Sequence, residues 1–193
     1  MIKKFVLGIT VICMAVFAAY GSTGQTGQQH NLGRVLILYY TWSEHAYTER
    51  AARIIQSLTG ATMIRVEPLT PFPDLNTRDM IAWVGTQRRN QLWPEIRDLG
   101  VDPASFDFIF IGTPVWHQTV ALPIETLLRE TDFGGRPVAC FALANNFEGQ
   151  VLNHFARLVR NAQVREGIAF RTITETRLEA RLTQWVNNMS RLP

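Results

Sequence analysis

The sequence predicts an α/β fold: a three-layer, doubly wound domain whose five-stranded parallel sheet is covered by helices on both faces. Five short apolar segments alternate with longer amphipathic ones along the chain, which is the pattern of repeated strand–helix units. Residues 106–112 are apolar at nearly every position, as expected for a parallel strand with two buried faces. Of the 193 residues, 47% are hydrophobic, so a single domain can bury a substantial core.

Residues 1–21 are expected to lie outside this domain. Two lysines near the start precede an apolar run at residues 5–17, and small residues follow it. This pattern is typical of a secretory signal peptide, so the protein is expected to be exported to a periplasmic or other extracytoplasmic location. The alternative is an uncleaved anchor that tethers the chain to a membrane through residues 5–21. Residues 22–32, rich in Gly, Gln, Ser and Thr, predict a flexible linker, and the domain then spans residues 33–193.

The composition of the remaining chain argues against several classes of function. Both lysines lie within residues 1–21, so 17 arginines face 16 acidic residues in the rest of the chain. These arginines are dispersed, whereas nucleic-acid binding needs a clustered basic face, so no nucleic-acid partner is expected. Cys140 lies in the apolar run 138–143 and is the one cysteine after the signal, which predicts a buried thiol and no disulfide. The dispersed histidines predict no metal site; they are His30, His45, His117 and His154.

The first predicted strand, residues 35–40, ends in a hydroxyl-rich loop that leads into a helix at residues 48–58. The first amides of a helix have no intrahelical acceptors, and the helix dipole adds positive potential there. Hydroxyls from Thr41, Ser43 and Thr48 would therefore suit a phosphate group at this junction. Alternatively, Ser43 or Thr48 merely caps the helix.

The stretch LILYYTWSEHAYTERAARI, residues 36–54, resembles the first strand and FMN phosphate loop of flavodoxins, which is usually Thr/Ser-x-Thr/Ser-Gly-Asn-Thr. The first two hydroxyl positions match, whereas Glu44 and His45 stand where Gly and Asn are usual. A carboxylate this close to a phosphate would repel it unless Glu44 points to solvent or His45 and Arg50 compensate for its charge. The resemblance implies an FMN cofactor whose phosphate is surrounded by Thr41, Trp42, Ser43, Glu44, His45, Ala46 and Thr48.

Residues 61–67 predict a second strand, followed by a proline-rich connection. This connection, Glu-Pro-Leu-Thr-Pro-Phe-Pro, resembles a Glu-Pro-x-x-Pro-Tyr-Pro segment of one flavodoxin-like subfamily. Amphipathic spacing predicts a helix at residues 78–91, interrupted at Gly85 and halted before the next proline. Arg88 and Arg89 are most simply the solvent-exposed face of this helix.

A second strand-to-helix junction joins residues 106–112 to a predicted helix at residues 122–130. Its sequence, IGTPVWHQTVALPIETLL, resembles the flavodoxin segment Ile-Gly-Thr/Ser-Pro-x-Trp, whose aromatic residue usually covers one face of the flavin ring. This implies that Trp116 stacks on the flavin and keeps water away from it. Alternatively, Trp116 fills a gap between sheet and helix. The resemblance implies flavin contacts from Thr113, Pro114, Val115, Trp116 and His117.

His117 is the candidate catalytic residue, as a proton donor near flavin N5, or alternatively an exposed loop residue. In flavodoxins a glycine in this loop often permits a peptide flip that favours a one-electron-reduced flavin. Neither His117 nor Gln118 is glycine, and positive φ costs such residues on the order of 1 kcal/mol. The resemblance together with this departure predicts chemistry closer to two-electron transfer.

The fourth predicted strand, residues 136–143, leads to a loop whose counterpart in flavodoxins is commonly glycine-rich and binds the pyrimidine edge of the ring. Asn145 and Asn146 tolerate left-handed backbone and could supply amide donors to that edge, or they are plain turn residues. A helix through residue 160, a strand at 164–170 and a helix at 175–189 complete the predicted fold. The resemblance implies ring contacts from Ala144, Asn145 and Asn146.

In the flavodoxin strand order 2-1-3-4-5, the loops after strands one, three and four meet at one edge of the sheet, where ligands bind. The resemblance therefore implies an exported FMN-binding protein in electron transfer or oxidoreductase chemistry. Its electron donor or acceptor would be a protein or a small quinone-like molecule, and both an enzyme and a non-enzymatic carrier fit. The alternative is a flavodoxin-fold binding or scaffold protein that has lost the flavin.

Overall fold

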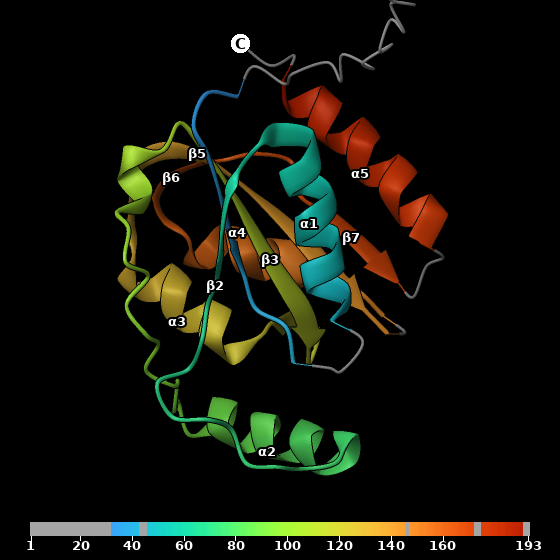
Figure 1. Ribbon diagram of the computed structural model, residues 1–193. Helices are drawn as coiled ribbons and strands as arrows, with labels where there is room; N and C mark the ends of the chain where they lie inside the picture. The colour runs from blue at the N-terminus through green and yellow to red at the C-terminus, as the bar shows by residue number, and fades with distance from the viewer. Residues whose placement is uncertain (1–31, 43–45, 146, 172–174, 191–193) are drawn as a thin grey trace, which may run out of the picture.

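A parallel β-sheet lies between two layers of helices, and one further helix lies at its edge (Figure 1). The computed structural model describes residues 32–42, 46–145, 147–171 and 175–190, so the predicted signal peptide lies outside the described residues. None of the described helices is long and apolar enough to cross a membrane. The strands are β1 (Val35–Tyr39), β2 (Thr62–Arg65), β3 (Phe108–Trp116), β4 (Thr119–Val120), β5 (Asp132–Ala144), β6 (Arg160–Val164) and β7 (Ile168–Arg171). The helices are α1 (Tyr47–Thr59), α2 (Thr77–Arg89), α3 (Leu122–Glu130), α4 (Val151–Leu158) and α5 (Glu175–Met189), with a short 3₁₀ helix at Pro103–Ser105.

The strand order is β2-β1-β3-β5-β6, and β7 also pairs with β5. All of these pairings are parallel, so the predicted order 2-1-3-4-5 is confirmed, with β5 as its fourth strand. The fifth strand, predicted at residues 164–170, is instead divided into β6 and β7. The register is Arg136↔Ala162 for β6 and Phe141↔Ile168 for β7. A register shift lies between Asp132 and Arg136 where β5 pairs with β6, as at a β-bulge.

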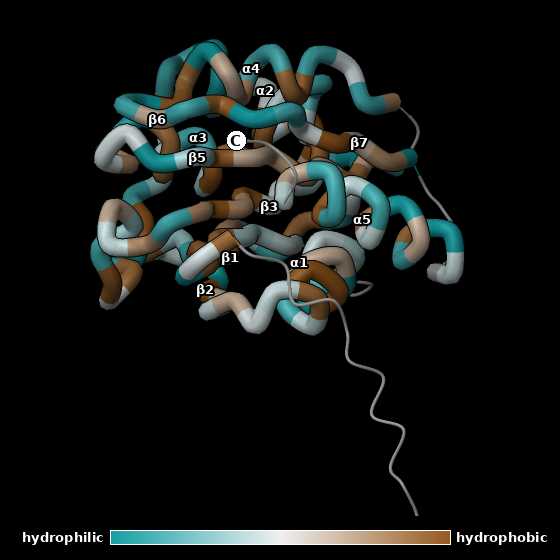
Figure 2. Tube along the Cα trace, turned by 90° about the horizontal axis from the view of Figure 1, so that it is seen from above, coloured by the Kyte–Doolittle hydropathy of each residue, from teal (hydrophilic) through white to brown (hydrophobic). Residues whose placement is uncertain are grey.

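Two hydrophobic cores lie on opposite faces of the sheet, because successive residues of a strand point to opposite sides. Ile37 and Phe110 pack in the core covered by α1 and α5, whereas Leu38 and Ile111 pack in the core covered by α3 and α4. Figure 2 shows this layering from above, with α1 and α5 together on one side of the strands. Cys140 belongs to the second core, and burial raises the pKa of its thiol. The prediction of a buried cysteine is therefore confirmed.

Helix α2 covers neither face of the sheet and lies instead beyond the carboxyl ends of the strands (Figure 1). Met80 and Val84 on its apolar side pack against Leu122 of α3. The predicted interruption at Gly85 is wrong, because the helix runs through this residue. A Cβ atom at Gly85 would lie 3.1 Å from Cε1 of His117, so the glycine allows the histidine ring to approach the helix closely.

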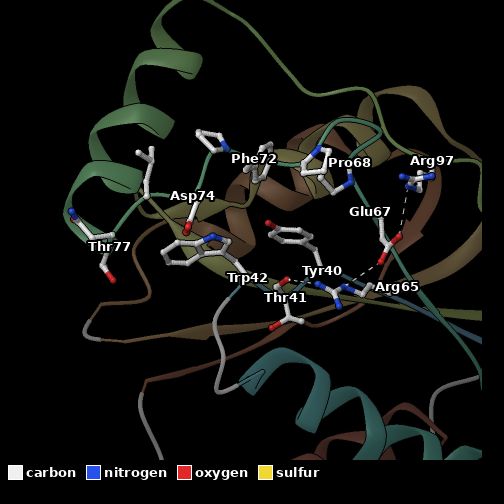
Figure 3. A pocket seen from close by; sticks show the side chains of 14 residues that line it. Tyr40, Thr41, Trp42, Arg65, Glu67, Pro68, Phe72, Asp74, Thr77 and Arg97 are labelled. Atoms are coloured by element: carbon white, nitrogen blue, oxygen red, sulfur yellow. Dashed lines mark hydrogen bonds and ion pairs between the residues drawn. The ribbon is translucent and has the colours of Figure 1, made fainter.

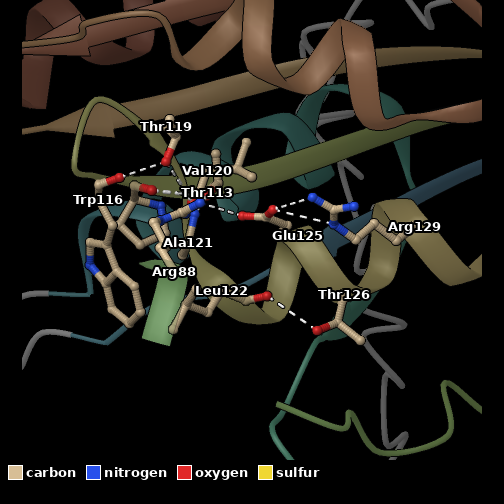
Figure 4. A network of polar contacts seen from close by, with 11 residues as sticks. Arg88, Thr113, Trp116, Thr119, Val120, Ala121, Leu122, Glu125, Thr126 and Arg129 are labelled. Carbon is tan, nitrogen blue, oxygen red and sulfur yellow. Dashed lines mark hydrogen bonds and ion pairs between the residues drawn. The ribbon is translucent and has the colours of Figure 1, made fainter. Parts of the chain in front are cut away.

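Arg88 fastens α2 to the rest of the domain (Figure 4). Its guanidinium donates to a carboxylate oxygen of Glu125 and to the carbonyl of Val120. Glu125 is only 2% exposed and also accepts two hydrogen bonds from Arg129, at 2.7 and 3.2 Å. The prediction that Arg88 belongs to a solvent-exposed face is therefore wrong. The helical pattern could not show this, because Glu125 lies 37 residues further along the chain.

Two titratable groups of this cluster have shifted pKa values. Burial would raise the pKa of Glu125, but Arg129 and Arg88 outweigh burial and hold this pKa below its usual range. Burial lowers the pKa of His154, and Arg88 acts in the same direction, against the attraction of Glu125. Nδ1 of His154 is buried and has no hydrogen-bond partner among the described residues. At neutral pH, Glu125 is therefore charged and His154 is neutral.

Replacing Arg88 should destabilise the protein far more than replacing its neighbour. In the Arg88→Met variant the buried Glu125 loses one of its two cationic partners, so we expect the free energy of unfolding to fall by about 2–4 kcal/mol. Arg89→Met is the matched control, because Arg89 is exposed and its hydrogen bond to Thr86 stays within the helix; its effect should stay within about 0.5 kcal/mol. Urea denaturation measures both values. Equal losses in the two variants would show that Arg88 does not anchor α2.

The free energy of unfolding should decline as the pH falls below about 6.5, the unperturbed pKa of histidine. Because the pKa of His154 is lowered in the folded state, the unfolded chain binds a proton first and acid favours unfolding. Glu125 adds to the loss only at lower pH, as its carboxylate becomes protonated below the pKa of the unfolded chain. In the His154→Gln variant we expect a shallower decline between about pH 7 and pH 5.5. Urea denaturation at a series of pH values measures the slope, and an unchanged slope would rule out His154 as its source.

Candidate functional site

A cavity of about 600 Å³, the edge pocket, opens at the carboxyl edge of the sheet beside the start of α1, helix α2 and the ends of β3, β5 and β7. Its volume is within the usual range for small-molecule sites. All three loops predicted to bind the flavin contribute to its wall. The predicted site residues that line it are Thr41, Trp42, Thr48, Pro114, Val115, Trp116, His117, Ala144 and Asn145.

Two predicted site residues that the structure describes do not line the edge pocket. The Thr113 side chain is buried, and its hydroxyl accepts from the amide of Ala121 at 2.9 Å and donates to the carbonyl of Pro114 at 2.8 Å. Thr113 therefore braces the β3–β4 hairpin. Ala46 occupies the N-cap position of α1 with a φ of 45°, so it bends the chain into the helix. The remaining predicted residues lie outside the described part of the chain: Ser43, Glu44, His45 and Asn146.

One corner of the edge pocket is suited to an anion. Helix α1 begins there without a side-chain cap, so Thr48 does not have the capping role that was the alternative for it. Thr48 is 2% exposed and Thr41 is 5% exposed, and the small exposed part of both residues lines the edge pocket. Hydroxyls beside the first amides of a helix are suited to an anionic ligand.

The wall opposite this corner is a tight hairpin. Strand β3 runs to Trp116, turns through His117 and Gln118, and returns as β4. Both turn residues have positive φ, 49° and 63°, which is the backbone of a type I′ turn. The absence of glycine therefore does not keep the loop out of this conformation. The carbonyl of Gln118 accepts from the amide of Gln150 at 2.9 Å, and the hydroxyl of Thr119 donates to the carbonyl of Trp116 at 2.8 Å, so surrounding bonds offset the strain.

His117 connects this hairpin to α2. Its Nε2 atom lies 2.6 Å from the carbonyl oxygen of Ile81. A carbonyl oxygen can only accept, so Nε2 carries a proton and Nδ1 is the other ring nitrogen available to a ligand. A role for His117 as a proton donor stays a prediction, and the geometry limits it to Nδ1 of the protonated ring.

Trp116 is half-buried and belongs both to the pocket wall and to an aromatic cluster. Its ring centroid lies 5.5 Å from that of Tyr40 and 6.1 Å from that of Trp42, both in edge-on geometry. A third neighbour, Phe72, is 6.0 Å away. These contacts hold the indole in one orientation at the pocket, as a stacking residue requires.

Several residues of the wall were not predicted as site residues. Phe147 follows the Asn pair in the third loop and is 63% exposed. An aromatic residue next to a predicted flavin-binding loop could have been predicted as a ring contact. The apolar face of α2 was recognised as amphipathic, but no local pattern places it over the pocket. No group of His, Cys, Asp or Glu residues suited to a metal ion occurs in the described part of the chain. The unpredicted lining residues are Tyr47, Thr77, Met80, Ile81, Val84, Gln118, Leu143, Phe147, Phe170, Arg171 and Leu178.

Known proteins of similar sequence and structure identify the family. A sequence profile described as Flavodoxin matches residues 34–189. A flavoprotein from Lactobacillus acidophilus NCFM, crystallised in complex with FMN, is 25% identical with a TM-score of 0.63, and the match covers 77% of this chain and 99% of that one. A protein from Bacteroides eggerthii DSM 20697 shares the fold at 19% identity and a TM-score of 0.68, covering 82% of this chain and 98% of that one. No curated protein matched. Since the profile spans most of the sequence, the chain belongs to the flavodoxin family.

Proposed function

We propose that this flavodoxin binds FMN noncovalently in the edge pocket and transfers electrons between a reductant and a small quinone-like molecule or a protein partner. The observation that carries the proposal is the pair of threonine hydroxyls, from Thr41 and Thr48, that line the edge pocket beside the uncapped start of α1. Hydroxyls, helix amides and the helix dipole together recognise a phosphate group. We also propose that the protein is exported or membrane-tethered, on the basis of the apolar run at residues 5–17.

The other walls of the edge pocket suit the flavin ring. Trp116, on one wall, offers an indole in a fixed orientation, and the exposed Phe147 offers a second aromatic surface. Met80 and Val84 of α2 add apolar surface that would keep water from the ring. When bound, FMN supplies the redox chemistry, and His117 offers Nδ1 as a group that exchanges protons with solvent or ligand.

The relative from Lactobacillus acidophilus supports a flavin cofactor, because that flavoprotein was crystallised with FMN. A flavin-free binding or scaffold protein is the second candidate, since Glu44 and His45 replace the Gly-Asn pair usual in the phosphate loop. The colour of the purified protein distinguishes the two. Yellow protein that releases FMN on denaturation agrees with a flavoprotein, whereas colourless protein that ignores added FMN would favour the scaffold.

The phosphate corner is tested by removing one hydroxyl and comparing two flavins. The Thr48→Val variant keeps the side-chain shape, so FMN should bind about ten- to a hundredfold more weakly, as expected for a lost hydrogen bond to a charged group. Riboflavin lacks the phosphate and should bind wild type and variant equally. Thr62→Val, an exposed threonine of β2, is the matched control. Flavin fluorescence titration of the apoprotein gives the affinities. An equal loss of affinity for both flavins would show that the phosphate does not bind at this corner.

A substitution in the wall that would bind the ring should affect both flavins, unlike one at the phosphate corner. Trp116→Leu should weaken FMN and riboflavin alike, by about tenfold, because stacking acts on the ring common to both. Trp83→Leu is the control: Trp83 packs on Phe72 in the same aromatic cluster, at 5.1 Å, but does not line the edge pocket. The same fluorescence titration measures both variants. Equal effects of the two substitutions would show that Trp116 acts only through packing.

A further inference from the structure

We propose a second small-molecule site, the side pocket, which takes an aromatic molecule carrying one anionic group such as a carboxylate or sulfonate. The side pocket encloses about 700 Å³ on the β2 side of β1. The end of β1, the end of β2 and the proline-rich connection at residues 68–76 form it (Figure 3). The proposal concerns a different cavity from the edge pocket and does not depend on FMN binding.

The first observation is the Tyr40 hydroxyl. Tyr40 is 4% exposed and lines the side pocket. Its ring is held edge-on by Trp116 at 5.5 Å and by Phe72 at 6.3 Å, and its hydroxyl end points into the hollow in Figure 3. This hydroxyl has no hydrogen-bond partner among the residues that the structure describes. Since it is also not among the fully buried atoms that lack a partner, the hydroxyl is accessible from the side pocket and can donate to an acceptor atom of a ligand.

The protonation state of Tyr40 makes it a donor. Burial raises the pKa of its hydroxyl strongly, and the opposing effect of Arg65 is smaller. The group therefore keeps its proton at any physiological pH. A carbonyl, carboxylate or sulfonate oxygen accepts from such a hydroxyl, whereas an ammonium group does not.

The walls beside Tyr40 are apolar and flat. Trp42 and Phe72 contribute aromatic rings, and Pro68, Pro71 and Pro73 contribute rigid apolar surface. Small-molecule sites commonly combine such walls with a few fixed polar groups. The combination suits a planar ring better than a flexible polar chain, because a ring loses little conformational freedom on binding.

The charges of the side pocket are divided between its two ends. Arg65 and Arg97 lie together at one end, with Glu67 between them, and Asp74 lies beside Trp42 at the other (Figure 3). The nitrogen–oxygen distances to Glu67 are 3.8 Å and 3.7 Å, and about half of each side chain is exposed. Pairs of this kind are weak, so the guanidinium of Arg97 remains able to turn toward a ligand. Two arginines against one glutamate leave a net positive end that selects an anionic group.

A pair of related probes tests the proposal: 2-naphthoate, an aromatic carboxylate, and the uncharged 2-naphthamide. Both are titrated calorimetrically into protein saturated with FMN, so that the edge pocket is blocked. Naphthoate should bind more tightly than naphthamide, and neither should displace FMN. Tyr40→Phe removes only the hydroxyl and should weaken both probes on the order of fivefold, with FMN affinity unchanged because Tyr40 does not line the edge pocket.

Arg97→Gln tests the charge. It should weaken naphthoate about three- to tenfold and leave naphthamide unchanged. Arg78→Gln is the matched control, because Arg78 is exposed on α2 and lines neither cavity. Arg65 is less suitable, because its guanidinium also donates to the carbonyl of Thr41 at 3.3 Å and a change there would disturb the wall of both pockets.

Three results would overturn the proposal: no binding of naphthoate, competition with FMN, or affinities that neither Tyr40→Phe nor Arg97→Gln changes. If the protein binds no FMN, the same titrations on the flavin-free chain still report on the side pocket through these two variants. Failure of the flavin proposal and failure of this one are therefore distinguishable.

Discussion

The parallel pairing of β1 with a strand on each side is the constraint on which the rest of the structure depends. Parallel strands end at the same edge, and the chain leaves β1 toward β2 but leaves β3 toward β5, so the loops after β1 and β3 diverge and leave a crevice between them. The edge pocket opens on the β3 side of that loop and the side pocket on the β2 side, and Thr41 and Trp42 line both. The few residues after β1 therefore form a partition between two cavities, so one short loop contributes to the wall of both.

Helix α2 completes the edge pocket although it packs on neither face of the sheet. Its apolar side meets α3, Arg88 reaches the buried Glu125, and the carbonyl of Ile81 accepts from His117. Desolvation of a buried ion pair offsets much of its attraction, so the main effect of the Arg88–Glu125 pair is to define where α2 lies. Once the helix is fixed, its apolar residues become a wall of the pocket. The buried charges thus act on the edge pocket by fixing the position of α2.

The sequence was sufficient for the fold because strand and helix signals are local. The first strand and the predicted strand order match the structure, and the three loops chosen as candidates line one cavity. Non-local features were missed. Strand β3 extends to Trp116 because β4 pairs with its end. Arg88 forms an ion pair with Glu125 of α3. Gly85 leaves room for the ring of His117. Phe147 was not predicted, because the Asn pair beside it indicates backbone donors and gives no sign of a ring contact.

The hairpin at His117 and Gln118 shows how the fold stores and uses strain. Two residues with side chains hold positive φ there, a backbone that persists only where the surroundings enforce it. Hydrogen bonds hold this backbone from both sides. Nε2 of His117 donates to the carbonyl of Ile81 in α2, and the amide of Gln150 donates to the carbonyl of Gln118. Gly149 adds a steric limit, because a Cβ atom there would lie 2.2 Å from that of Gln118. A wall fixed in this way needs little ordering when a ligand binds. The energetic cost of the strained turn is met during folding, so it does not reduce the binding free energy.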